Sequence, residues 1–257
     1  MRSQQLTALI RLATSEIRRT LLPWLVVGAV GLCLLGAEFA AGLAVTESAE
    51  YRIVIYSAAV RVLLVMLLGL AVIANTVRES DDRLVELLLS RPVPRSTWYL
   101  AKFCGYALAA IPIAIAAALP IVILNRGWAA LAWSGSLACE LSIVVAAALT
   151  AAVGLVQVPA AFAVLCGFYF LARAIAEVVL LSTVSIVDLT TPTNRVIAAL
   201  VNGLSYLVPD LGRFTSSSWL IYEPPSLPTL EFIVGQTALY CSLLVAVGLV
   251  DFHRRNL

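Results

Sequence analysis

The chain has 257 residues, of which 61% are hydrophobic and only 12% are charged, with a net charge of +2. A soluble domain is nearer half apolar and a quarter charged, so these values exclude a soluble globular protein and indicate an integral membrane protein. The small net charge gives no support for nucleic-acid binding. The informative feature is where the basic residues lie along the chain.

Residues 1–19 have the periodicity of an amphipathic helix. Apolar side chains recur on one helical face, and polar and basic side chains lie opposite. We expect this helix to lie flat at the membrane interface with its arginines toward lipid phosphates. The apolar face holds Leu6, Leu9, Ile10, Ala13 and Ile17, opposite Gln4, Arg11, Ser15 and Arg18.

Six apolar runs are long enough to cross a bilayer, which takes about 20 helical residues. They predict an all-α fold: a single transmembrane domain over residues 1–257 with six spans. Gln157 and Pro159 interrupt what would otherwise be one continuous stretch, so we expect a tight turn between the fourth and fifth spans. The runs are 21–44, 53–77, 103–124, 129–156, 158–181 and 232–250.

The basic residues predict an orientation. With the N-terminus inside, the inner segments hold eleven arginines and lysines and the outer segments hold four. This bias places both termini and residues 79–95 in the cytoplasm. Residues 182–231 then form one long outer loop, in which the apolar stretch 196–207 predicts a short helix lying on the membrane. A loop of this length is unusual without a function, so an external gate, a docking surface and a solvated connector all remain open.

Five ionisable residues fall inside the spans: Glu38, Arg61, Glu140, Arg173 and Glu177. Each is costly at bilayer depth and should be paired or face water. Counting helical rise places all five toward the outer half. We expect Glu38 to pair with Arg61, and Arg173 to share a helix face with Glu177, four residues on. A water-accessible cavity that contacts substrate or gates its exit, and ion pairs that fix helix register, both remain open.

The five cysteines all lie in apolar runs, without C-x-x-C spacing, which indicates buried small hydrophobic residues. They predict neither a disulfide framework nor a zinc site, and no metal or catalytic residue is expected. The chain has no G-x-x-x-x-G-K-[ST] motif and no hydrolase motif. We therefore expect that it is not an enzyme by itself and binds no cofactor.

Residues 79–95, between the second and third spans, have the pattern of a short helix with start and stop signals. Leu84, Leu87 and Leu88 fall at i, i+3 and i+4 and make one apolar face. Acidic residues cap the first turn, and Pro92 ends the helix. A plain linker does not need a leucine face, so this helix is expected to lie on lipid or dock in the groove of another protein.

Here the sequence resembles the ABC type-2 exporter permeases. In that family an acid after the second span leads into T-L-E-x-L-L, a small residue, x-P, an arginine and a later lysine. The corresponding residues here are Glu79, then L-V-E-L-L-L-S-R-P-V-P-R over 84–95, and Lys102 at the start of the third span. The sequence departs from the family at Arg83-Leu84, where Gly-Thr is usual, so the detailed contacts of the helix are expected to differ.

The resemblance implies that residues 79–95 are a coupling helix seated in a cleft of a separate ABC ATPase subunit, which binds ATP and Mg²⁺. It also implies a second permease chain, identical or not, and a place in the bacterial cytoplasmic (inner) membrane. The function implied is coupling of ATP hydrolysis to export of a substrate across the bilayer. The docking residues expected are Arg78, Glu79, Arg83, Glu86, Leu87, Leu88 and Arg91.

Two other functions remain open. One is a membrane scaffold or assembly factor whose outer loop, 182–231, docks an extracytoplasmic partner. The other is an ion-coupled secondary transporter that uses Glu140, Arg173 and Glu177.

Overall fold

The computed structural model describes residues 2–43, 48–81, 94–123, 127–183, 199, 203–205 and 207–254. These residues form helices and turns with no strand among them, which confirms the all-α class. Six described helices are long and apolar enough to cross a membrane, so the protein is a multi-pass membrane protein. The long helices are α1 (Arg2–Arg19), α2 (Leu22–Leu43), α3 (Ser48–Asp81), α5 (Arg95–Ile123), α6 (Gly127–Leu155), α7 (Val158–Thr183) and α10 (Leu227–Arg254); between the last two lie η1 (Leu211–Arg213) and α9 (Ser218–Ile221).

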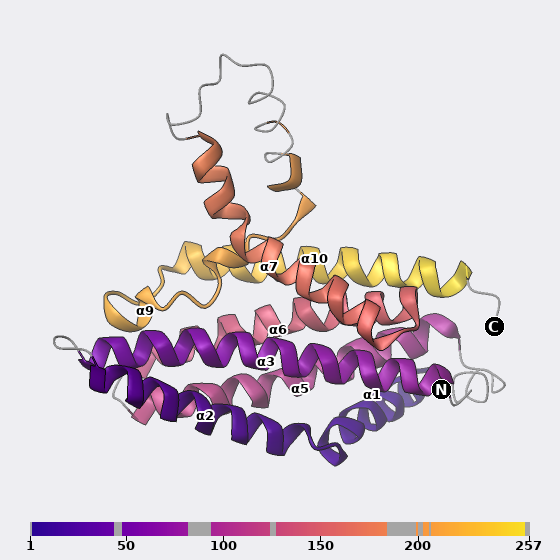
Figure 1. Ribbon diagram of the computed structural model, residues 1–257. Helices are drawn as coiled ribbons and strands as arrows, with labels where there is room; N and C mark the ends of the chain where they lie inside the picture. The colour runs from indigo at the N-terminus through magenta and orange to yellow at the C-terminus, as the bar shows by residue number, and fades with distance from the viewer. Residues whose placement is uncertain are drawn as a thin grey trace.

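Helices α3 and α6 form the centre of the bundle (Figure 1). α3 packs against α2, α5, α6 and α7, and α6 packs against α3, α5, α7 and α10. α6 is the most buried span, with Leu137, Leu141 and Leu149 completely enclosed. Its many alanines, glycines and serines let neighbouring helices approach on several sides, as is usual for helix contacts in membranes.

The N-terminal helix predicted from periodicity is confirmed as α1, but its apolar face is covered by protein. Ala13 and Ile17 are buried, and α1 packs mainly against α5. The contact is close at Gly105 of α5, where a Cβ would come within 2.6 Å of the Ala13 Cβ. A side chain at position 105 would therefore push α1 away from the bundle.

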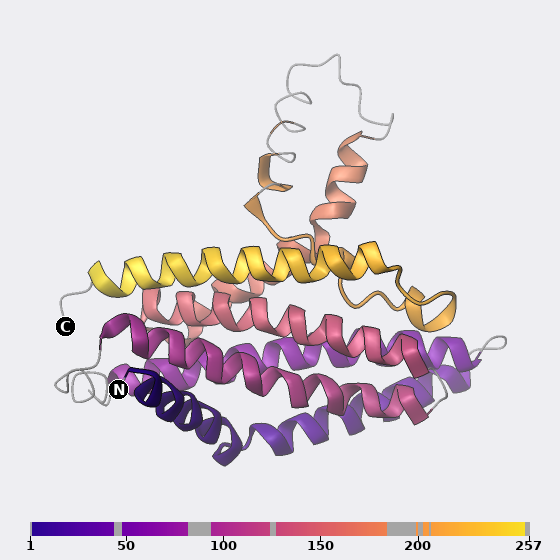
Figure 2. The same cartoon turned by 180° about the vertical axis from the view of Figure 1, so that it is seen from behind.

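One end of the bundle collects several chain segments. α1 begins there, α3 ends there, α5 starts there and α10 finishes there (Figures 1 and 2). Residues 82–93, which connect α3 to α5 in the sequence, lie outside the described residues. The ends of α3 and α5 that flank the segment resembling a coupling helix therefore lie at the same end of the bundle as the start of α1 and the end of α10 (Figures 1 and 2).

The tight turn expected near Gln157 is confirmed. α6 ends at Leu155 and α7 begins at Val158, so two residues reverse the chain. Val156 has φ 51°, the left-handed conformation common at helix C-termini, and its N–H still donates to the Ala152 carbonyl at 3.1 Å. Pro159 lies in the first turn of α7, where a missing N–H costs nothing.

The loop expected over 182–231 has narrower bounds, because α7 ends at Thr183 and α10 begins at Leu227. The second half of α7 turns away from the bundle and continues to Thr183 (Figures 1 and 2). α10 begins at Leu227, before the apolar run at 232, because Pro228 fits the first turn of a helix. The helix expected over 196–207 lies mostly outside the described residues, although 203–205 and 207 are helical.

Candidate functional site

Residues 208–222, called the capping segment below, fold back onto the bundle at the end opposite the 82–93 connection. They contain η1 and α9 and contact α3, α6 and α7. Leu211, Phe214, Thr215 and Leu220 are buried, so this part of the predicted outer loop is inserted among the spanning helices. The insertion brings its backbone carbonyls next to the ionisable residues of the spans.

Thr215 is the centre of the contact because all of its polar atoms are used. Its N–H donates to Ser136 Oγ at 3.0 Å, and its hydroxyl donates to Glu140 Oε2 at 2.7 Å. Its carbonyl accepts from Arg61 Nη1 at 2.8 Å and from Trp133 Nε1 at 3.3 Å. Hydrogen bonds from three directions fix this residue against α3 and α6.

The backbone of Thr215 is strained. Its φ is 47°, in the left-handed region that β-branched residues avoid. Such a conformation costs on the order of 1–3 kcal/mol and persists where surrounding contacts determine it, typically at clamps and switches. The same hydrogen bonds that hold Thr215 therefore keep the capping segment in a conformation that would relax on release.

Glu140 is the buried acceptor of the site, with an exposed fraction of 0%. Besides Thr215, it accepts from the Tyr169 hydroxyl at 2.9 Å and pairs with Arg173 Nη1 at 3.6 Å. Arg173 in turn donates to the carbonyls of Leu211, at 2.6 Å, and Phe214, at 3.1 Å. The polar core, defined as Arg61, Ser136, Glu140, Tyr169, Arg173 and Thr215, thus joins α3, α6, α7 and the capping segment.

The polar core contains three of the five ionisable residues predicted from the sequence. The expected pair of Glu38 with Arg61 is wrong, because Glu38 pairs with Arg52 Nε at 3.1 Å. Arg52 lies nine residues, or about 13 Å of helix, before Arg61 and so faces the end of α2 that carries Glu38. Arg61 instead donates to the Thr215 carbonyl of the capping segment.

Arg173 and Glu177 lie four residues apart on α7, as expected from their spacing. Glu177 is exposed, however, and the carboxylate that pairs with Arg173 belongs to Glu140 on another helix. Sequence reasoning missed Ser136, Tyr169 and Thr215 altogether. The signal available for Thr215 was the hydroxyl run at 215–218, which lies within an otherwise apolar neighbourhood.

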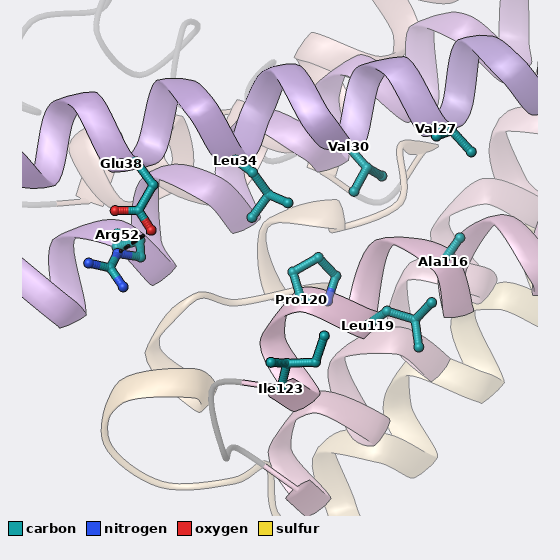
Figure 3. A pocket seen from close by; sticks show the side chains of 9 residues that line it. All are labelled: Val27, Val30, Leu34, Glu38, Arg52, Ala116, Leu119, Pro120 and Ile123. Atoms are coloured by element: carbon teal, nitrogen blue, oxygen red, sulfur yellow. Dashed lines mark ion pairs between the residues drawn. The ribbon is translucent and has the colours of Figure 1, made fainter.

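An apolar groove of about 450 Å³ lies between α2, α3 and α5 (Figure 3). The Glu38–Arg52 ion pair lies at one end, and apolar side chains of α2 and α5 face each other along the rest. A second hollow of about 430 Å³ shares Val27 and Ala116 with it and continues toward α1. The groove has the apolar lining that lipid chains cover in a bilayer. It is lined by Val27, Val30, Leu34, Glu38, Arg52, Ala116, Leu119, Pro120 and Ile123.

A second ion cluster lies at the opposite end of the bundle, around Lys102. The Lys102 ammonium, on a residue only 5% exposed, pairs with Glu16 Oε2 at 3.1 Å and with the Glu79 carboxylate. It also donates to the Tyr106 hydroxyl at 3.2 Å. The Lys102 cluster, defined as Glu16, Glu79, Lys102 and Tyr106, therefore fastens the last turn of α3 to α1 and α5.

The docking residues expected from the sequence fall into two groups. Glu79 points into the Lys102 cluster, with a side chain 14% exposed, and Arg78 beside it is exposed. The ion pair of Glu79 with Lys102 therefore fixes the position of the last turn of α3, immediately before residues 82–93. The remaining docking residues, Arg83, Glu86, Leu87, Leu88 and Arg91, lie outside the described residues.

Within the described part of the chain, no three His, Cys, Asp or Glu residues gather closely enough to hold a metal ion. The described cysteines are free thiols in the helices. No protein-family model and no curated protein matches the sequence. Two buried ion clusters are therefore the features that bear on function: the polar core, level with the middle of α6, and the Lys102 cluster, near the start of α5, joined by α3.

Proposed function

We propose that the chain is the transmembrane permease subunit of an ABC transporter, coupling ATP hydrolysis by a separate ATPase subunit to export of a substrate. The observation that carries the proposal is the continuity of α3, which runs unbroken from Ser48 to Asp81. It holds Arg61 in the polar core and Glu79 in the Lys102 cluster. These residues are eighteen positions apart, or about 27 Å of rigid helix.

The mechanism follows from that continuity. An ATPase docked on residues 79–95 pushes the end of α3, and the Lys102 cluster makes α1 and α5 move with it. A shift of α3 moves Arg61 away from the Thr215 carbonyl. The hydrogen bond between them is 2.8 Å long and breaks when the two groups separate. The strained capping segment then withdraws, and the far end of the bundle opens as an exit gate.

This proposal includes a second permease chain. The second half of α7 turns away from the bundle (Figures 1 and 2), and Val178 on it is exposed. A paired chain in the bilayer would cover that surface and form the opposite wall of the exit path. The arginine bias supports cytoplasmic termini, with the capping segment on the outer side, and the family resemblance supports a bacterial inner membrane.

The geometry favours this function over an ion-coupled transporter built on Glu140, Arg173 and Glu177. A coupling carboxylate must exchange protons or ions with water. Glu140 is fully enclosed and accepts from Tyr169 and Thr215, whereas Glu177 is exposed and belongs to no shared site with it.

Affinity purification from native membranes tests the ATPase docking. The intact chain is expected to bring down a protein with a nucleotide-binding P-loop, identified by mass spectrometry. The double variant Glu86→Arg with Leu88→Asp is expected to lose it, because a charge reversal and a buried charge disrupt the apolar docking face. Equal membrane levels of the variant chain show that insertion is intact.

The matched control makes the same two chemical changes at the opposite end of the bundle. Glu223→Arg with Leu227→Asp alters two exposed residues beside the capping segment and should retain the ATPase. If the Glu86 and Leu88 variant retains the ATPase as well as this control does, residues 79–95 are not the docking site. If the unaltered chain brings down no ATPase, the permease proposal itself fails.

A further inference from the structure

The polar core carries more positive than negative charge. Arg61 and Arg173 contribute two guanidinium groups, while Glu140 is the one carboxylate among the described residues that pairs with this core. Asp210 pairs with Arg213 at 2.8 Å and also interacts with Arg173, but it belongs to the capping segment. Once that segment withdraws, one unit of positive charge is left over at a depth where unpaired charge is costly.

Arg61 has incomplete hydrogen bonding. The residue has an exposed fraction of only 8%, and it donates through Nη1 to the carbonyl and hydroxyl of Thr215, at 2.8 and 3.3 Å. Its Nε is buried without a hydrogen-bond partner. A guanidinium has five N–H donors arranged to grip the two oxygens of an anion, and buried polar groups seldom lack partners.

The oxygens to which the two arginines donate hydrogen bonds belong to the capping segment. Arg61 donates to the Thr215 carbonyl, and Arg173 donates to the carbonyls of Leu211 and Phe214. When this segment withdraws, both guanidinium groups lose those acceptors together. The excess charge then requires other oxygens, and carboxylate and phosphate groups suit a guanidinium because they can accept two parallel N–H bonds from it.

We propose that Arg61 and Arg173, uncovered by withdrawal of the capping segment, bind the phosphate or carboxylate group of an anionic amphiphile. The inference rests on the proposed gating and names the substrate class for it. An anionic group supplies paired oxygens for the guanidinium forks and neutralises the excess charge. Phe170, one helical turn before Arg173 on α7, is 54% exposed, so an apolar tail has a surface to lie on beside the anionic group.

Native mass spectrometry of the purified full chain in an uncharged detergent tests the site, with dodecyl phosphate as the probe. Dodecyl phosphate is expected to bind about tenfold or more tightly than inorganic phosphate or dodecyltrimethylammonium. Arg61→Gln and Arg173→Gln should each weaken binding about tenfold or more, since each removes one of two charged partners. Arg254→Gln, which removes an exposed arginine in the last turn of α10, is the matched control and should leave affinity within about twofold.

Glu140→Gln is expected to have the opposite effect on the affinity for dodecyl phosphate. Glu140 pairs with Arg173 and so competes with the ligand for it, and removing the Glu140 charge should therefore tighten dodecyl phosphate binding. Equal affinity of Arg61→Gln and the unaltered chain would overturn the proposal. If Arg61→Gln does not fold, Glu140→Gln decides, and unchanged or weaker binding overturns the proposal. Tight binding of inorganic phosphate alone would exclude an amphiphile.

A disulfide tests whether the segment must withdraw. Ser57 Oγ and Ser217 Oγ lie 2.8 Å apart, so Ser57→Cys with Ser217→Cys can be oxidised to hold the capping segment shut. Binding should vanish on oxidation and return on reduction, and undiminished binding by the oxidised chain would contradict the uncovering step.

Nanodiscs containing phosphatidylglycerol separate two sources of the anionic amphiphile. Retention of this lipid that depends on Arg61 identifies a membrane phospholipid, and no such retention identifies a free amphiphile. None of these anion-binding assays involves the ATPase. Failure of the docking experiment and failure of the anion site are therefore separate results.

Discussion

Replacing Glu140 with alanine is expected to lower the free energy of unfolding by about 3–5 kcal/mol, as is typical when one partner of a buried ion pair is removed. The change leaves Arg61 and Arg173 facing each other at membrane depth without a carboxylate. It also leaves the hydroxyls of Tyr169 and Thr215 without their acceptor. Titration of the purified chain with SDS in mixed micelles, followed by circular dichroism, measures the loss.

Glu177→Ala is the matched control for this experiment. Glu177 is exposed on α7 and outside the polar core, so its loss should change the free energy of unfolding by no more than about 0.5 kcal/mol. Equal effects of the two substitutions would mean that Glu140 is not the residue that neutralises the core. Glu140→Gln should cost less than Glu140→Ala, because an amide oxygen can still accept from Thr215.

Replacing Lys102 with methionine is expected to be similarly severe, at about 3–5 kcal/mol. Methionine fills the space between Trp98 and Tyr106, but Glu16 and Glu79 then lie together without the cation that both contact. Two like charges in a partly buried site repel, and α1 should detach from the end of α3. The same SDS titration measures the stability.

Adding Glu79→Gln to the Lys102→Met chain provides the control. It removes the more enclosed of the two carboxylates, since the Glu79 side chain is 14% exposed and that of Glu16 is 31% exposed. The double variant should therefore recover a large part of the lost stability. No recovery would show that Lys102 stabilises the fold through packing and not through its charge.

Hydropathy and periodicity predicted the spans well because each is a local property of the sequence. The six apolar runs became six helices, α1 formed where the amphipathic pattern began, and the turn formed at Gln157. The sequence places the beginning of α10 too late, because Pro228 falls within the segment expected to be an outer loop. Proline is equally suited to the first turn of a helix, and the choice between the two depends on whether the next residues can continue that helix.

The candidate site was predicted less completely because its partners are distant in the sequence. Charge and depth identified Arg61, Glu140 and Arg173, but pairing by depth alone assigned Arg61 to Glu38. Apart from the hydroxyl run at 215–218, the sequence gives no sign that residues 208–222 insert among α3, α6 and α7 and supply carbonyl acceptors. Arg52 was counted as outside the membrane, although the helix that carries it extends beyond the apolar run and reaches Glu38.

The proposed mechanism depends on ATP at one end of the bundle releasing the capping segment at the other. Ser136 lies under that segment, 2% exposed, and its hydroxyl accepts from the Thr215 N–H. With the five native cysteines replaced by alanine, Ser136→Cys provides a single thiol that a membrane-impermeant thiol reagent reaches only when the segment withdraws. The chain is co-purified with its ATPase, reconstituted in nanodiscs, and labelled with and without ATP and Mg²⁺.

We expect slow labelling of the thiol introduced at position 136 without nucleotide and about tenfold faster labelling during ATP turnover, equivalent to a shift of about 1.4 kcal/mol toward the open state. The Glu86→Arg with Leu88→Asp change should abolish the acceleration and leave the slow rate unchanged. A labelling rate that ATP does not alter, in a complex that hydrolyses ATP, would contradict the coupling of the two ends.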